Sequence, residues 1–294
     1  MVLMVSGRCD IVAFHTPWFL NRLKEGYVMT RNPFNKKLVS QINFSDVDLI
    51  LFCTKNPLPI IDHLNSIKKP ILFHVTLTPY KNDIEVNVID KNKIIDGIKR
   101  ISKILGKENI VVRYDPIFVS DKYTIDYHKK AFERLCIMLD GYIEKFIVSF
   151  IDDYKNVRKN YNILRYKELS EDDYKEIGTF FSSVAKEHGM TVQTCAEKRN
   201  LVEYGFIEGE CISYEVAYIL TGKKFKSQKI RPNVNCHCVE TVDIGEYNTW
   251  SHLCKYCYAN FDEDIIKENR KLHDVNSPLL IGHLEDDDII KIRC

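Results

Sequence analysis

Short apolar runs rich in β-branched residues recur along the first two thirds of the chain. They occupy residues 2–5, 49–52, 71–77, 110–114, 146–150 and 191–194. Each run is almost continuously apolar rather than alternating with polar residues, which is typical of parallel strands that are covered on both faces. We therefore predict a parallel sheet of about six buried strands.

Segments with a helical spacing of apolar residues lie between these runs, at residues 91–105, 124–139 and 171–188. Ser170 and Asp173 resemble a capping box that opens the last of these helices. Strand and helix thus alternate about six times, which predicts a parallel α/β fold. We favour a β/α barrel, or part of one, over an open doubly wound sheet.

After residue 221 the alternation of predicted strands and helices gives way to a segment rich in lysine and then in cysteine. We expect residues 1–221 to form the barrel-like domain and residues 222–294 to form a cysteine-rich, metal-binding appendage packed on it. Residues 223–231 hold four lysines and an arginine. Such a segment is usually a solvated linker, and contact with nucleic acid is the alternative.

Composition places the chain among soluble globular proteins, with 45% hydrophobic and 28% charged residues. The 42 basic and 41 acidic residues give a net charge of +1, so no global electrostatic attraction to nucleic acid or acidic membranes is expected. The first apolar run is too short for a signal peptide or a membrane span. We expect a cytoplasmic protein whose cysteines are kept as thiols.

Four of the ten cysteines fall within residues 236–257, as the pairs Cys236/Cys238 and Cys254/Cys257. Two thiol pairs brought together by a turn can surround one metal centre, and both zinc and an iron–sulfur cluster use such ligands. Spacing alone does not choose between the two.

Polar residues directly follow the predicted strands. The carboxyl ends of parallel strands converge, so these side chains are expected to share one pocket. Turn chemistry explains the neighbouring prolines, but charged groups beside apolar strands have to be solvated, paired or functional. The candidates are Arg8, Asp10, Lys55, Arg113, Asp115, Asp152 and Glu197.

Several short motifs together carry a family resemblance. They are Arg-Asn-Pro-Phe-Asn at 31–35, Thr-Lys-Asn-Pro at 54–57, Arg-Tyr-Asp-Pro at 113–116, Thr-Cys-Ala-Glu at 194–197, Asp-Ile-Gly-Glu-Tyr-Asn-Thr at 243–249 and Tyr-Cys-Tyr-Ala-Asn at 256–260. With these motifs the chain resembles, nearly end to end, the bacterial domain-of-unknown-function family eighteen forty-eight. The C-terminal cysteines of that family resemble the Cys-x3-Cys-x2-Cys motif of radical S-adenosylmethionine (SAM) enzymes.

The resemblance implies a [4Fe-4S] cluster that is held by three thiolates and binds SAM at its fourth iron. Cys254 and Cys257 match the last two motif cysteines, and Tyr256 matches the aromatic residue that commonly stacks near the adenine. Trp250 stands where the first motif cysteine should be and cannot bind iron. Cys236 or Cys238 could supply the third thiolate, whereas ligation by all four cysteines would close the site to SAM.

Two hypotheses follow. The first is an iron–sulfur enzyme resembling radical SAM enzymes, acting on an unknown small or nucleotide-like substrate with an electron donor as partner. Its pocket would use Arg8, Lys55 and Arg113 for anionic groups and Asp115 or Glu197 for a cation or a proton. Asp10 is a further candidate of the same pocket. Cys195 would be a hydrogen-atom donor, unless it is simply a buried thiol.

The second hypothesis is a binding protein without catalysis at the metal. Zinc would close a structural four-cysteine site, and residues 223–231 could contact nucleic acid. Trp250 favours this reading, whereas Tyr256 favours the first.

Overall fold

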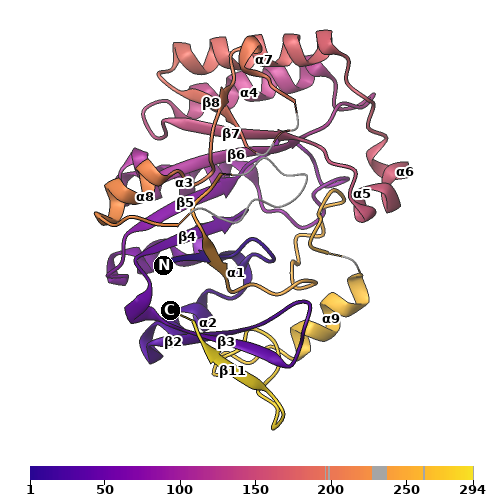
Figure 1. Cartoon of the computed structure of the whole chain (residues 1–294). Helices are drawn as coiled ribbons and strands as arrows, with labels where there is room; N and C mark the ends of the chain where they lie inside the picture. Colours follow the sequence, from indigo (N-terminus) through magenta and orange to yellow (C-terminus); the bar gives the residue numbers. More distant parts are fainter. Residues whose placement is uncertain (196, 198, 227–236, 261, 294) are drawn as a thin grey trace.

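A sheet of eight parallel strands forms the centre of the molecule (Figure 1), in the order β10-β1-β4-β5-β6-β7-β8-β9. The structure is a computed structural model that describes residues 1–195, 197, 199–226, 237–260 and 262–293. In sheet order, the strands are β10 (Thr241–Asp243), β1 (Val2–Val5), β4 (Leu49–Thr54), β5 (Ile71–Thr76), β6 (Ile110–Ile117), β7 (Lys145–Phe150), β8 (Thr191–Thr194) and β9 (Ile207–Glu208).

The six predicted strands are all present, so the α/β prediction is confirmed. Two very short strands, β9 and β10, were not predicted and form the two edges. They are not paired with each other, so the sheet formed by the described residues is open and a closed barrel is not observed. Edges of two and three residues offer few backbone groups for closure by hydrogen bonds.

The helices predicted from apolar spacing are confirmed as α3, α4 and α7. The Thr124 side chain caps α4, and Ser170 and Asp173 form the predicted capping box of α7. The α-helices are α1 (Ile11–Phe14), α2 (Thr16–Glu25), α3 (Lys91–Leu105), α4 (Ile125–Leu139), α5 (Lys155–Lys159), α6 (Tyr161–Leu164), α7 (Glu171–Glu187), α8 (Tyr214–Thr221) and α9 (Glu263–Lys271). Short 3-10 helices are η1 (Phe44–Asp46), η2 (Leu58–Ser66), η3 (Lys107–Asn109) and η4 (Val202–Tyr204).

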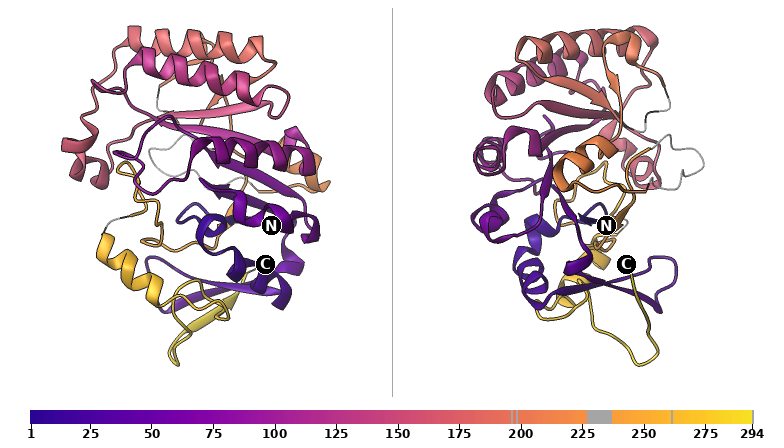
Figure 2. Two further views of the ribbon diagram at one scale, coloured as in Figure 1. Left: turned by 180° about the vertical axis from the view of Figure 1, so that it is seen from behind. Right: turned by 60° about the vertical axis from the view of Figure 1, so that its left-hand side comes forward.

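Apolar side chains cover both faces of the sheet, which explains the continuous apolar runs. One face, with Ile50 and Phe73, packs against α3, α4 and α7 in the main core. On the other face Leu49 and Leu51 pack against α8, through Ala217. In Figure 2, α4 and α7 lie at one end of the molecule, far from α9 and β11.

A second sheet of three strands lies at the end opposite α4 and α7 (Figures 1 and 2), in the order β11-β3-β2. Its strands are β2 (Tyr27–Arg31), β3 (Leu38–Asn43) and β11 (Ile289–Ile292). Strands β2 and β3 are antiparallel, and β11 is parallel to β3. This sheet was not predicted.

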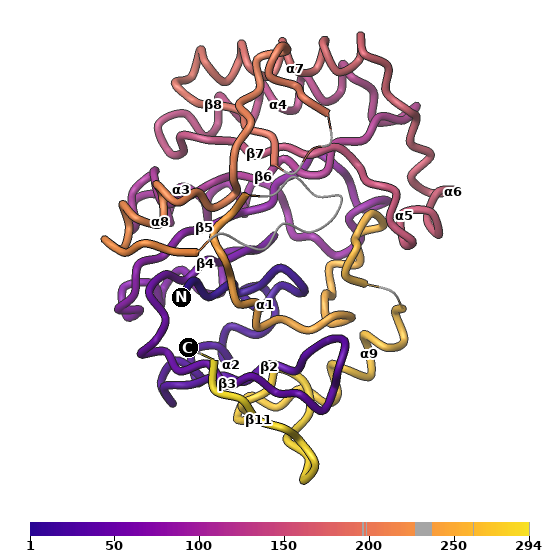
Figure 3. Tube along the Cα trace, in the orientation of Figure 1, coloured from indigo at the N-terminus to yellow at the C-terminus, as the bar shows by residue number. Residues whose placement is uncertain are grey.

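The chain from residue 237 onward runs along the edge of the large sheet before it reaches the small one (Figure 3). It first adds β10 beside β1, and then an isolated bridge joins Cys254 to Glu85. Across the described part of the chain, no helix combines the length and apolar character that a bilayer span needs.

Candidate functional site

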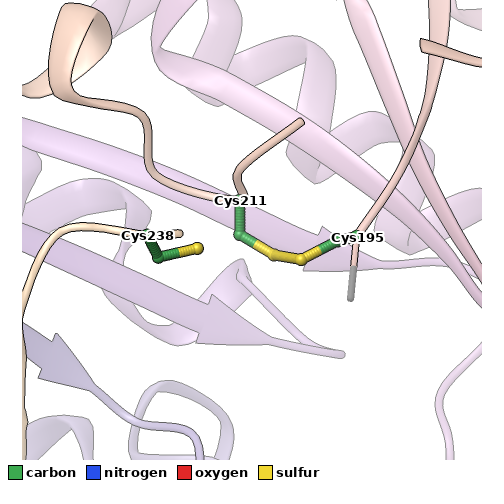
Figure 4. A group of neighbouring side chains, drawn as sticks. All are labelled: Cys195, Cys211 and Cys238. Atoms are coloured by element: carbon green, nitrogen blue, oxygen red, sulfur yellow. A yellow bond between two sulfur atoms is a disulfide. The ribbon is translucent and has the colours of Figure 1, made fainter. Parts of the chain in front are cut away.

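Three cysteines that are far apart in the sequence meet beside the sheet (Figure 4). The sulfur atoms of Cys195, Cys211 and Cys238 all lie within 4.8 Å of one another. Cys195 and Cys211 form a disulfide with a Cα–Cα distance of 6.2 Å, and the Cys238 sulfur points toward this pair. Cys238 is buried, whereas the other two are half-buried. This group is called the cysteine triad below.

The sheet places the triad. Cys195 directly follows β8, Cys211 follows β9, and Cys238 precedes β10. The Val239 backbone N–H donates to the carbonyl oxygen of Ile212 at 3.1 Å, which fixes the second and third cysteine segments side by side. The triad therefore collects residues from both edges of the sheet.

A row of hydrogen-bonded polar and charged side chains contacts the triad. Arg113, on β6, donates through Nη1 to the Cys211 sulfur at 3.2 Å and through Nε to Asp115 at 3.0 Å. Ser149 at the end of β7 donates to the other Asp115 oxygen. Burial lowers the pKa of Arg113, but the Asp115 carboxylate outweighs burial and raises it. A fixed cation thus faces the sulfur of Cys211, where it would stabilise a thiolate.

A cavity of about 260 Å³ adjoins the triad segments. Its walls include Thr194, Glu197, Glu210 and His237, which are neighbours in sequence of the three cysteines. An oxygen of Glu197 accepts the backbone N–H of Phe150 at 2.8 Å, which holds this carboxylate at the end of β7. The cavity can therefore present an anchored carboxylate and an imidazole to a small molecule.

Cys254 and Cys257 lie in a different, largely apolar cluster, and Trp250 packs against it. Both are buried free thiols, and the Cys257 backbone N–H donates to the Cys254 carbonyl oxygen at 3.1 Å. Burial raises the pKa of Cys254 and raises that of Cys257 to about 11, so both thiols are neutral near pH 7.

A buried ionic network binds this segment to the sheet. Lys55 at the end of β4 donates to Glu85 at 2.7 Å, and Lys91 and the Tyr256 hydroxyl also contact Glu85. Burial raises the pKa of Glu85, but the two lysines outweigh it and lower the pKa to about 2. The Lys55 ammonium lies 5.4 Å from the centre of the Tyr256 ring. Tyr256 is therefore held by an ion pair in this structure.

Asp10 and His252 form a second buried contact between the end of β1 and the C-terminal segment. Their Oδ2 and Nε2 atoms are 2.9 Å apart. The same Asp10 oxygen accepts the Lys55 backbone N–H at 2.8 Å, and its other oxygen caps α1. Arg8 donates to the Asp243 carbonyl oxygen at 2.8 Å. Asp10 and Arg8 thus hold the C-terminal segment in place.

The structure groups the predicted site residues in two places. Arg113, Asp115, Cys195 and Glu197 lie at the triad, whereas Asp10, Lys55 and Tyr256 lie at the ionic network. Among the predicted metal ligands, Cys238 is in the triad, Cys254 and Cys257 are in the separate apolar cluster, and Cys236 lies outside the described residues.

Three residues of these contacts were not predicted from the sequence: Cys211, Glu85 and His252. Cys211 stands alone in the sequence, so spacing gave no signal for it. Glu85 lies in a loop and follows no strand. His252 is the one of the three for which the sequence held a signal, because it lies two residues before the predicted ligand Cys254.

Comparisons with known proteins give one strong match. The family model described as "Domain of unknown function (DUF1848)" matches residues 2–259. No curated protein matches the chain. Among solved structures, one from Bacteroides thetaiotaomicron VPI-5482, described provisionally as an alpha-L-fucosidase, is 9% identical with a TM-score of 0.28, covering 76% of this chain and 81% of that one. A TM-score this low carries no information about fold or activity.

Proposed function

The chain belongs to the family of domains of unknown function DUF1848, and we propose that it is a metal-dependent enzyme with a zinc ion bound by Cys195, Cys211 and Cys238. The observation that carries the proposal is the mutual distance of the three sulfur atoms, within 4.8 Å. A tetrahedral zinc ion with Zn–S bonds of about 2.3 Å separates its sulfur ligands by roughly 3.8 Å. Reduced thiols at these positions need only small side-chain movements to reach that geometry.

The closeness of the three sulfur atoms favours a single ion over a cubane cluster, because a cluster bonds each thiolate to a different iron atom. Arg113 supports thiolate ligation by donating to the Cys211 sulfur. Such donors around a metal site orient the ligands and tune their basicity. A reducing compartment such as the cytoplasm would keep the thiols available.

The enzymatic part of the proposal rests on the cavity beside the triad. Its volume of about 260 Å³ suits a small substrate. When bound, zinc would supply a Lewis acid near this cavity, because Thr194, Glu210 and His237, which line it, are the sequence neighbours of the three cysteines. Glu197, held by the Phe150 backbone, can accept a proton from a molecule in the cavity, and His237 can donate one.

The iron–sulfur enzyme that the family resemblance implies is the second candidate. The buried thiols of Cys254 and Cys257, with Tyr256 between them, support it. Against it, Trp250 occupies the first motif position, and among the described residues the triad is the group of three cysteine sulfur atoms close enough to share a single metal ion. SAM and an electron donor would be its further requirements.

Metal analysis separates the two candidates. The whole chain is expressed with both zinc and iron supplied, purified anaerobically with a reductant, and assayed for zinc, iron and sulfide. We expect about one zinc per chain, lost in Cys195→Ser and Cys211→Ser. Cys254→Ser and the control Cys136→Ala, a buried cysteine of α4, should retain it.

Iron and sulfide that disappear in Cys254→Ser would instead establish the second candidate. Folded protein without any metal, in the presence of a reductant, would refute both. Circular dichroism of each variant verifies that the fold is retained.

A further inference from the structure

Strand β11 leaves an apolar edge open to solvent. Among the described residues only β3 pairs with it, so β11 is an edge of the small sheet. Ile289, Ile290 and Ile292 are 54%, 45% and 63% exposed. An exposed apolar edge strand is a template for pairing with another chain, and proteins usually block such edges.

The open edge of β11 has backbone groups that can hydrogen-bond to a further strand. Ile289 donates its N–H to the Lys37 carbonyl oxygen at 2.7 Å, and Arg293 donates to that of Gln41 at 2.8 Å. Alternate residues of a strand bond to the same neighbour, so the N–H and C=O groups of Ile290 and Ile292 face the open edge.

The side chain of Ile290 continues a buried apolar face. Ile290 is in register with Val39 of β3, and register partners share one face of a sheet. Val39 is fully buried against Met29 and Leu279. Ile290 therefore extends this cluster to the surface.

The charges around β11 identify the partner. Residues 285–288 are Glu-Asp-Asp-Asp, whereas Lys291 and Arg293 lie at the other end of the strand. Two such strands in antiparallel order bring each acidic end against a basic end. The strand is thus complementary to itself, as a twofold interface requires.

We propose that β11 pairs with β11 of a second copy of this chain, antiparallel about a twofold axis at Ile290. In this register Ile290 faces its own equivalent. Asp287, in the turn before β11, comes close to Arg293 of the second copy, and the two exchange exposed ion pairs within their own chains, with Lys37 and Glu240, for this one. A register centred on Lys291 would place two lysines opposite each other, which is unfavourable. The small sheets of the two copies then join into one continuous sheet.

A charge swap tests the register in the full chain, with sedimentation equilibrium as the readout. Asp287→Arg and Arg293→Asp should each weaken the dimer by roughly tenfold or more, because each places like charges opposite each other twice. The double variant should restore wild-type dimerisation. Asp62→Arg, the same charge change at a side chain that is 80% exposed on η2, should have no effect.

A crosslink provides the second measurement. Opposed residues in a hydrogen-bonded antiparallel pair have Cα atoms about 5.5 Å apart, which suits a disulfide. Ile290→Cys should therefore form covalent dimers on mild oxidation, and Ile289→Cys should not. A wild-type chain that stays monomeric at high concentration, or a double variant that fails to restore the dimer, would overturn the proposal.

Discussion

Arg113 donates a hydrogen bond to the sulfur of Cys211 across 3.2 Å, although 98 residues separate them in the sequence. The two residues meet because Arg113 lies on the central strand β6 and the chain after β9 runs back over the sheet, where Ile212 packs against Leu49 and Leu51 of β4. The contact links the charged residues of the strand ends to the cysteine triad. It leads to the first prediction.

Arg113→Met should lower the zinc affinity of the reduced chain by roughly 10- to 100-fold, the usual loss when a residue that supports a metal ligand is removed. Arg113→Lys keeps the positive charge but lacks the several N–H donors of the guanidinium. Its zinc affinity should lie between those of the wild type and Arg113→Met. Competition with a chromophoric chelator measures the affinity. Arg199→Met is the matched control, since Arg199 lines the cavity but pairs with Glu171. Equal affinities of folded Arg113→Met and wild type would contradict a role for this contact.

Zinc binding should require reduction of the chain. The Cys195–Cys211 disulfide engages two of the three sulfur ligands, so oxidised protein should bind no zinc at the triad. After reduction by a phosphine, we expect uptake of about one zinc ion per chain. Peptide mapping after alkylation identifies the disulfide, and equilibrium dialysis measures the zinc. Equal zinc uptake by both forms would place the metal elsewhere.

Glu85→Gln should destabilise the chain near neutral pH by about 3 kcal/mol or more, because it leaves the lysines of a buried ion pair without their counter-charge. The pKa of Glu85 falls from 4.5 to about 2 in the folded chain. Its ionised form therefore contributes stability that is fully present above pH 4.5 and is lost as the pH falls toward 2. Urea unfolding across this window measures the effect. The wild type should lose more stability than Glu85→Gln, and parallel curves would refute the assignment.

Gly178→Ala should destabilise the chain even though alanine favours helices. A Cβ atom at this position of α7 would lie 2.6 Å from the Tyr204 Cβ and 3.0 Å from the Tyr204 carbonyl oxygen. Overpacking of this kind costs about 1–3 kcal/mol, more than the roughly 1 kcal/mol gained in helix propensity. Thr179→Ala, at the next and exposed position, should be neutral or stabilising. Chemical denaturation compares the two, and an unchanged Gly178→Ala midpoint would show that η4 moves freely.

The large sheet was predictable because buried parallel strands leave a distinctive pattern. Its apolar runs are covered on both faces, by α3, α4 and α7 on one and by α8 on the other. The small sheet left no such pattern, since β2 and β3 bury few positions and β11 is exposed throughout. The pairing of β11 with β3 depends on contacts between residues about 250 positions apart, which one sequence does not reveal.

The site was predictable only as far as strand ends could be recognised. Arg113, Asp115 and Glu197 were named because they stand near the ends of predicted strands. The structure places Arg113 and Asp115 within β6 beside the triad, and Glu197 in the wall of the adjoining cavity. The cysteines were grouped by their closeness along the chain, so Cys211 was overlooked. Which thiols meet depends on the order of strands in the sheet, and in particular on β10 pairing with β1.

The position of the triad would give a bound metal ion a mechanical role. Cys238 belongs to the β10 edge, and Cys195 and Cys211 belong to the β8–β9 edge. An ion shared by these sulfur atoms would add coordination bonds to the Val239–Ile212 hydrogen bond that already joins the two segments. Loss of the ion would then leave only that bond and the apolar packing of Ile212 and Val239 to hold the segments together.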